Sequence, residues 1–107
     1  MNKHLIFDSE GAAEKAVAIN TIRKIKIEER TYALARTSKG YSIFSSSCPH
    51  AGADLTQGRL NYLNEIVCPL HAYQFNLLDG EETSKRCPPI KTYPTFWEGD
   101  KLYVNIK

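Results

Sequence analysis

Two short cysteine–histidine pairs constrain this chain more than any other feature. One residue separates Cys48 from His50, two separate Cys68 from His71, and residues 51–67 lie between the pairs. Structural zinc fingers usually group their ligands as two cysteines followed by two histidines. Here each short segment offers one thiolate and one imidazole, so we expect the fold to hold two similar loops face to face.

This mixed order suits a site with two metal ions in different surroundings. Both thiolates can bind one iron and both imidazoles the other, with two bridging sulfides, which is the ligand set of a [2Fe–2S] centre with two histidine ligands. Two simpler interpretations stay open. The four residues could form a mononuclear zinc site, or the cysteines could be unrelated core residues and the histidines incidental.

The residues around both pairs resemble the Rieske family of [2Fe–2S] domains. The first segment reads Cys-Pro-His-Ala-Gly-Ala-Asp-Leu over residues 48–55, and the second reads Cys-Pro-Leu-His-Ala-Tyr-Gln-Phe-Asn over residues 68–76. The resemblance extends over residues 31–106. It implies one [2Fe–2S] cluster per chain, bound by Cys48, His50, Cys68 and His71.

The resemblance also implies an all-β fold, a Rieske-like antiparallel β-sandwich or barrel with a small cluster-binding insertion. We expect a single Rieske domain over residues 1–107, which is an ordinary length for one domain. The insertion would cover about residues 45–76, and the remainder would form a basal β domain.

Local patterns favour many short strands, because runs of β-branched and aromatic residues alternate with turn residues. Turns are predicted at Glu29-Arg30 and at residues 38–40, where Gly40 can adopt a positive φ. Residues 11–18 could form a short helix or lead into the first strand. The expected strands cover residues 22–27, 31–37, 41–44, 56–60, 64–67, 73–78, 90–96 and 101–106.

The family resemblance implies electron transfer as the function. A chain of this kind would be a soluble one-electron carrier that receives electrons from a flavin-dependent reductase and passes them to a terminal oxygenase. It would be a component of an oxidoreductase system and not a complete enzyme, because the sequence carries no flavin or nucleotide motif. One alternative is a small Rieske subunit of a nitrite reductase-like enzyme, and a less favoured one is a structural zinc module.

Bulk properties restrict the partners. The net charge of +2 is too small to favour nucleic acid binding. No stretch approaches the roughly 20 apolar residues of a membrane-spanning helix, and the N-terminus lacks the apolar core of a signal peptide. If Cys48 and Cys68 bind metal, Cys87 has no cysteine partner within the chain, which favours a reducing, cytoplasmic location.

Several positions that raise the potential of other Rieske proteins carry different residues here. By the resemblance, high-potential relatives have a disulfide between the positions of Ala53 and Leu70. They also have serine in place of Tyr73 and tyrosine in place of Phe75. These differences predict a reduction potential near the low end of the Rieske range, about −150 mV. The family usually has glycine where this chain has Ala72, and a positive φ there would cost about 1 kcal/mol.

Other residues receive structural interpretations. Gly52 would permit close backbone approach to the cluster. We expect His4 to be solvated and Cys87 to be a free thiol in a loop that covers the cluster. Phe96 and Trp97 would pack in the core or in the last hairpin rather than form an electron relay.

Overall fold

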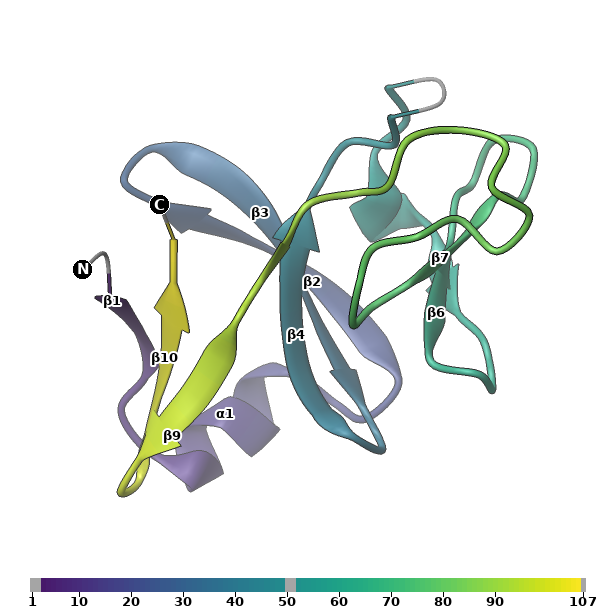
Figure 1. The fold of residues 1–107 in the computed structure, drawn as a ribbon. Helices are drawn as coiled ribbons and strands as arrows, with labels where there is room; N and C mark the ends of the chain where they lie inside the picture. Colours follow the sequence, from purple (N-terminus) through teal and green to yellow (C-terminus); the bar gives the residue numbers. More distant parts are fainter. Residues whose placement is uncertain (1–2, 50–51, 107) are drawn as a thin grey trace.

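The computed structural model describes residues 3–49 and 52–106, and its strands form three antiparallel sheets (Figure 1). Their strand orders are β1-β10-β9, β2-β3-β4-β8 and β5-β6-β7. The expected all-β fold is therefore confirmed. The strands are β1 (Lys3–Phe7), β2 (Thr21–Ile27), β3 (Arg30–Thr37), β4 (Gly40–Ser45), β5 (Arg59–Leu60), β6 (Glu65–Val67), β7 (Gln74–Asn76), β8 (Thr92–Tyr93), β9 (Thr95–Glu98) and β10 (Lys101–Asn105). The helical segments are α1 (Glu10–Ala16) and a 3-10 turn, η1 (Leu55–Gln57).

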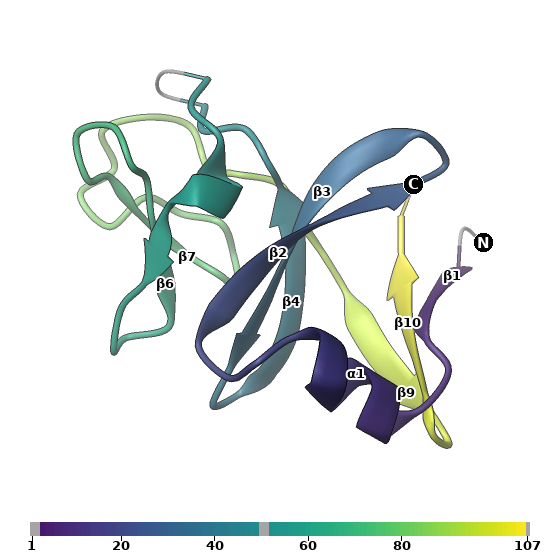
Figure 2. The same ribbon diagram turned by 180° about the vertical axis from the view of Figure 1, so that it is seen from behind.

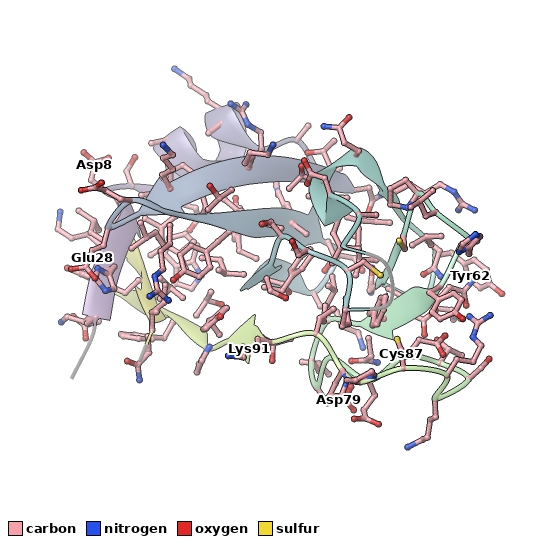
Figure 3. All side chains as sticks on the ribbon, turned by 90° about the horizontal axis from the view of Figure 1, so that it is seen from above. Asp8, Glu28, Tyr62, Asp79, Cys87 and Lys91 are labelled. Carbon is pink, nitrogen blue, oxygen red and sulfur yellow. The ribbon has the colours of Figure 1, made fainter. Side chains whose placement is uncertain are left out.

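The sheet that contains β2, β3 and β4 lies between the other two sheets (Figures 1 and 2). In both views β6 and β7 lie at one end of the molecule, and β1, β9 and β10 lie at the other. Figure 3 shows Tyr62 and Cys87 at the first end and Glu28 at the opposite end. The two ends of the described chain lie near each other because Lys3 of β1 pairs with Asn105 of β10.

β3 separates two hydrophobic cores because successive side chains of a strand point to opposite faces. Its alanines face the core that contains the cysteines, and its tyrosine and leucine face the core beside α1 and β10. The sheet of β2, β3, β4 and β8, called the basal sheet below, therefore directly supports the end of the molecule that carries β5–β7. The cysteine-side core consists of Ala33, Ala35, Phe44, Cys48, Leu55, Ile66, Cys68, Phe75, Leu77 and Ile90. The basal core consists of Val17, Tyr32, Leu34, Ile43, Val104 and Ile106.

The N-terminal segment contains more secondary structure than its sequence predicts. The helix foreseen as one possibility for residues 11–18 is α1, and the Ser9 hydroxyl caps it by accepting a hydrogen bond from the Ala12 N–H at 3.0 Å. β1 was not predicted, because it depends on pairing with β10 at the far end of the sequence. The expectation of a solvated His4 is wrong for the same reason. Its side chain is only 21% exposed, and its Nε2 lies 3.8 Å from a Glu28 carboxylate oxygen.

Two predicted strands are shortened or divided. The strand expected over residues 73–78 ends at Asn76, whose side-chain oxygen accepts a hydrogen bond from the Leu78 N–H at 2.7 Å and turns the chain. The strand expected over residues 90–96 is divided into β8, which pairs with β4, and β9, which pairs with β10. Pro94 lies between them and has no N–H to continue a ladder.

Two connections also differ from the sequence-based expectation. The turn after β2 consists of Glu28 and Glu29, with φ of 50° and 67°, one residue earlier than predicted. These values match the mirror-image turns that suit two-residue hairpins. Residues 56–60 do not form one strand, because η1 precedes β5. Gly40 adopts a φ of 120°, as predicted.

Candidate metal centre

Cys48 and Cys68 lie in two loops that share one hydrogen-bond pattern. Cys48 follows β4, and Cys68 follows β6. The Cys48 N–H donates to the Ala53 carbonyl at 2.8 Å, and the Cys68 N–H donates to the Tyr73 carbonyl, also at 2.8 Å. Each cysteine is therefore bonded to the residue five positions later, so both loops close on their own cysteine in the same way.

Both loops turn through residues with positive φ. Gly52 has a φ of 70°, His71 a φ of 65° and Ala72 a φ of 56°. Glycine adopts this conformation without a steric penalty, whereas a Cβ atom makes it unfavourable. The condition under which Ala72 would be strained is therefore met in this structure.

The two thiols lie together inside the protein, and His71 lies outside. Cys48 and Cys68 are 1% and 2% exposed, and their side chains are within hydrogen-bonding contact. Burial raises the pKa of the Cys68 thiol, and a hydrogen bond from the Leu70 N–H opposes that effect. His71 is exposed. The other predicted ligand, His50, lies outside the described residues.

This arrangement fits the ligand set of a [2Fe–2S] cluster. Two buried thiols in contact can hold one iron once they are deprotonated, and an imidazole at the surface can reach a second iron farther out. Among the described residues, no three histidine, cysteine, aspartate or glutamate side chains converge as a group that could hold one metal ion. A bound cluster of this type accepts and releases one electron.

Asp54 connects the first loop to the basal sheet. Its carboxylate accepts hydrogen bonds from the Thr56 hydroxyl at 2.6 Å and the Thr56 N–H at 2.9 Å, and it forms an ion pair with Lys24 of β2 at 2.9 Å. The Thr56 hydroxyl, followed by Lys24, holds the pKa of Asp54 below its usual value. Asp54, which follows the first loop, is thus fixed to both η1 and β2.

Gly58 brings the ends of the two loops into backbone contact, a feature that the sequence did not reveal. A Cβ atom at this position would lie 2.1 Å from the Val67 carbonyl oxygen. Val67 directly precedes Cys68. Only a residue without a side chain allows η1 to lie this close to the strand that delivers the second cysteine.

A third segment, residues 77–91, passes the same end of the molecule. It is closed by a hydrogen bond from the Ile90 N–H to the Gly80 carbonyl at 2.9 Å. Cys87 lies on this segment and packs, partly buried, against the cysteine-side core (Figure 3). All three cysteines are free thiols, and burial raises the pKa of Cys87, which lowers its thiolate fraction.

Sequence analysis missed two buried carboxylates near this centre. Glu65 is 8% exposed and accepts hydrogen bonds from Asn61 Nδ2 and Thr83 Oγ1, both at 2.9 Å. Glu82 is 1% exposed and is paired with Arg86. A glutamate four residues before an arginine is a recognisable pairing signal, but it is common on surfaces and does not reveal burial.

The last hairpin has the structural role that was expected. The Phe96 ring stacks on Tyr103 with centroids 5.8 Å apart, and the Trp97 ring meets the edge of Tyr41 at 5.9 Å. Phe96 therefore packs within this hairpin, whereas Trp97 packs against Tyr41 of β4 and stays 41% exposed. In the described part of the chain, no helix is long and apolar enough to cross a membrane.

The sequence is similar to ferredoxin subunits of aromatic-acid dioxygenases. A curated relative, the 3-phenylpropionate/cinnamic acid dioxygenase ferredoxin subunit of Shigella flexneri serotype 5b, is 28% identical over 75 residues. The match covers 69% of this chain and 71% of the relative. The same subunit of Escherichia coli K12 matches at the same identity and over the same shares.

The fold is similar to that of several solved proteins. The ferredoxin of carbazole 1,9a-dioxygenase from Nocardioides aromaticivorans IC177 superposes over 100% of both chains with a TM-score of 0.82 and 21% identity. A chain in the complex of reduced oxygenase and oxidized ferredoxin of carbazole 1,9a-dioxygenase matches over 85% of each chain, with a TM-score of 0.73 and 25% identity. A structure named for the NADH-dependent nitrite reductase small subunit of Mycobacterium tuberculosis matches over 95% of this chain and 92% of its own, with a TM-score of 0.78 and 15% identity.

The family assignment rests on a match that includes both cysteine loops. The model of the Rieske [2Fe-2S] domain matches residues 9–94, which is most of the chain. A domain that binds such a cluster needs paired loops, buried thiols and an exposed histidine, and the described residues provide these features. The protein therefore belongs to the Rieske [2Fe–2S] domain family.

Proposed function

We propose that this protein is a one-electron carrier that takes electrons from a flavin-dependent reductase and passes them to a terminal oxygenase. The observation that carries the proposal is the pair of buried, contacting thiols in matched loops next to an exposed histidine. Buried thiolates shield one side of a cluster, whereas an exposed imidazole gives a partner protein a short path to the other side.

In this proposal the four ligands have different positions. Cys48 and Cys68 would hold one iron, and His50 and His71 would hold the other. Imidazole donates less charge than thiolate, so the histidine-bound iron would be the one that accepts the added electron more readily. The exposed residues beside His71, which are Pro69, Leu70 and Ala72, would then lie at the electron exit.

The relatives support the choice of acceptor. The named sequence relatives are ferredoxin subunits of dioxygenases, and one similar structure contains an oxygenase together with its ferredoxin. A carrier of this kind is a component of an enzyme system and needs a reductase as its electron source. We place the protein in the cytoplasm, where its three cysteines would stay reduced, and treat residues 1–107 as one domain with a cluster-binding insertion at about residues 45–76.

A second candidate is a small subunit of a nitrite reductase-like enzyme, which the fold similarity supports. The two candidates predict different behaviour during purification. A carrier would separate from its oxygenase in ordinary salt, because transient redox complexes bury little surface. A permanent subunit would remain bound to a large redox enzyme.

The proposal is tested by anaerobic purification, counting of iron and acid-labile sulfide, and low-temperature EPR after reduction with dithionite. We expect about two irons and two sulfides per chain and a rhombic signal from the reduced cluster. Reduction of a purified terminal oxygenase by the reduced protein would then identify the acceptor. One zinc ion per chain and no EPR signal would refute the proposal.

Matched variants identify the ligands in the same assay. Cys48→Ser, Cys68→Ser and His71→Ala should each lose the native cluster signal, because each removes one ligand. Cys87→Ser and His4→Ala should retain it, because neither residue belongs to the proposed ligand set. Loss of the cluster in Cys87→Ser with retention in Cys48→Ser would contradict the assignment.

A further inference from the structure

Glu82 and Arg86 form a closely bonded ion pair on the segment that passes the metal centre. Glu82 Oε1 accepts hydrogen bonds from the Arg86 N–H at 2.8 Å and from Arg86 Nε at 3.0 Å, and Oε2 accepts one from Nη2 at 2.8 Å. Two parallel bonds between guanidinium and carboxylate fix both groups in orientation. The carboxylate is buried, while the Arg86 side chain is 43% exposed.

The guanidinium also lies on Tyr73, at 3.8 Å from the ring centroid. Tyr73 is the residue whose carbonyl accepts the hydrogen bond from the Cys68 N–H. The ion pair therefore connects the 77–91 segment to the residue that closes the second cysteine loop. An isolated β-bridge between Phe75 and Glu82 places the Glu82 backbone beside β7.

The charges of the pair act on Cys87, the partly buried thiol that packs against the core containing Cys48 and Cys68. Burial is the largest cause of the raised pKa of Cys87, the Cys48 and Glu82 charges raise it further, and the Arg86 charge lowers it. A unit charge in such partly buried surroundings is screened far less than one in water. The net charge of the pair is zero, so its two halves oppose each other at the cluster.

We propose that Glu82 and Arg86 are a charge-balanced pair of positioning residues whose opposite charges cancel at the cluster, so that neither charge alone shifts its reduction potential, and that the pair holds Tyr73 against the 77–91 segment. This inference rests on the proposed cluster. Reduction adds one negative charge to the cluster. An unpaired Arg86 would stabilise that charge and raise the reduction potential. An unpaired Glu82 would destabilise it and lower the reduction potential.

The test is a set of reduction potentials measured at pH 8 by voltammetry of cluster-loaded protein, with iron content and EPR spectra recorded for each variant. Glu82→Gln leaves a positive charge and should raise the potential, whereas Arg86→Gln leaves a negative charge and should lower it. Each change should be about threefold in the reduction equilibrium, or about 28 mV at 59 mV per tenfold change. The double variant should return close to the wild-type potential.

Two further variants separate charge from structure. Lys85→Gln removes the same charge one residue earlier, from an exposed pair with Glu81, and should leave the potential unchanged because water screens it. Arg86→Lys keeps the charge without the bidentate bond, so its potential should stay near that of the wild type, while the EPR line shape reports any movement of Tyr73. If Glu82→Gln does not fold, the comparison of Arg86→Gln, whose potential should fall, with Arg86→Lys, whose potential should not change, still decides the question.

Four results would overturn the inference. In three of them potentials change: Glu82→Gln and Arg86→Gln shift in the same direction, Arg86→Lys has the potential of Arg86→Gln, or Lys85→Gln shifts as much as Arg86→Gln. In the fourth, the potentials of all these proteins are equal. Failure of the proposed function looks different, because the wild-type protein would then contain no [2Fe–2S] cluster. Equal potentials in loaded wild-type and variant proteins would reject this inference alone.

Discussion

Ala72 has a side chain where the second cysteine loop requires a left-handed backbone, with a φ of 56°. Replacing Ala72 by glycine should raise the free energy of unfolding by a few tenths to about 1 kcal/mol, because the steric relief exceeds the added entropy of the unfolded chain. Urea unfolding of the cluster-loaded protein measures the change. Ala53→Gly is the matched control in the first loop. Ala53 is not among the described residues with positive φ, so this change should destabilise by about 0.5–1 kcal/mol.

Glu82 gives the protein a predictable response to acid. Its hydrogen bonds to Arg86 outweigh burial and lower its pKa from 4.5 to about 2. A carboxylate with a lowered pKa stabilises the fold fully above its unfolded value and loses that contribution as the pH falls from about 4.5 toward 2. The contribution at neutral pH is on the order of 2–3 kcal/mol.

The Glu82→Gln variant tests this response. The stability difference between wild type and variant should be smaller at pH 4 than at pH 6, by on the order of 1 kcal/mol, because only the wild type loses the ionised carboxylate. Urea unfolding at both pH values and constant salt measures it. An unchanged difference would mean that another group controls acid stability.

Phe75 lacks a hydroxyl that could donate a hydrogen bond to a cluster sulfur. Phe75 is fully buried beside the cysteines and has no hydroxyl, and by the family resemblance a tyrosine there belongs to high-potential proteins. Hydrogen bonds to sulfur raise the potential, and Phe75 cannot donate one. We therefore expect a wild-type midpoint potential of about −150 mV. Voltammetry at pH 7 measures it, and a midpoint clearly above zero would contradict the prediction.

At the scale of elements, the contact between η1 and β6 should be the least tolerant of added volume. Gly58→Ala would place a Cβ atom 2.1 Å from the Val67 carbonyl oxygen, and backbone on both sides leaves little freedom to adjust. We expect a loss of about 1–3 kcal/mol and reduced iron content, because Val67 precedes a ligand. Urea unfolding and iron analysis measure both effects.

Gly11→Ala is the control for that substitution. Gly11 lies in α1, and a Cβ atom there would meet nothing within 4 Å. Alanine should therefore stabilise this helix by about 0.4–1 kcal/mol with unchanged iron content. Equal losses in both variants would show that the contact at Gly58 has no special cost.

At the scale of the molecule, removal of the cluster should loosen one end and leave the other intact. The cysteine-side core contains Cys48 and Cys68, whereas the basal core contains no cysteine among its residues. Hydrogen exchange of cluster-loaded and iron-depleted protein should show increased exchange in residues 46–49, 52–60 and 65–90, while β3 and β10 stay protected. Equal loss of protection in both halves would indicate a single cooperative unit.

The sequence by itself determined the two cysteine loops, the all-β class and most strand positions. These depend on local features: the spacing of Cys48 and Cys68 from their histidines, β-branched runs, and turn residues such as Gly40. Pro94 was also visible in the sequence, but its effect was not, since dividing a predicted strand required knowing that β8 and β9 pair with different partners.

Only the tertiary structure decided which distant groups meet. β1 exists because β10 lies beside it, Gly58 is needed because Val67 approaches it, and the Glu82–Arg86 pair acts near the centre because Tyr73 lies under the guanidinium. The physical reason is that burial, steric contact and charge proximity depend on distance in space. Local propensity restricts each segment, but the packing of the β5–β7 end against the basal sheet fixes those distances.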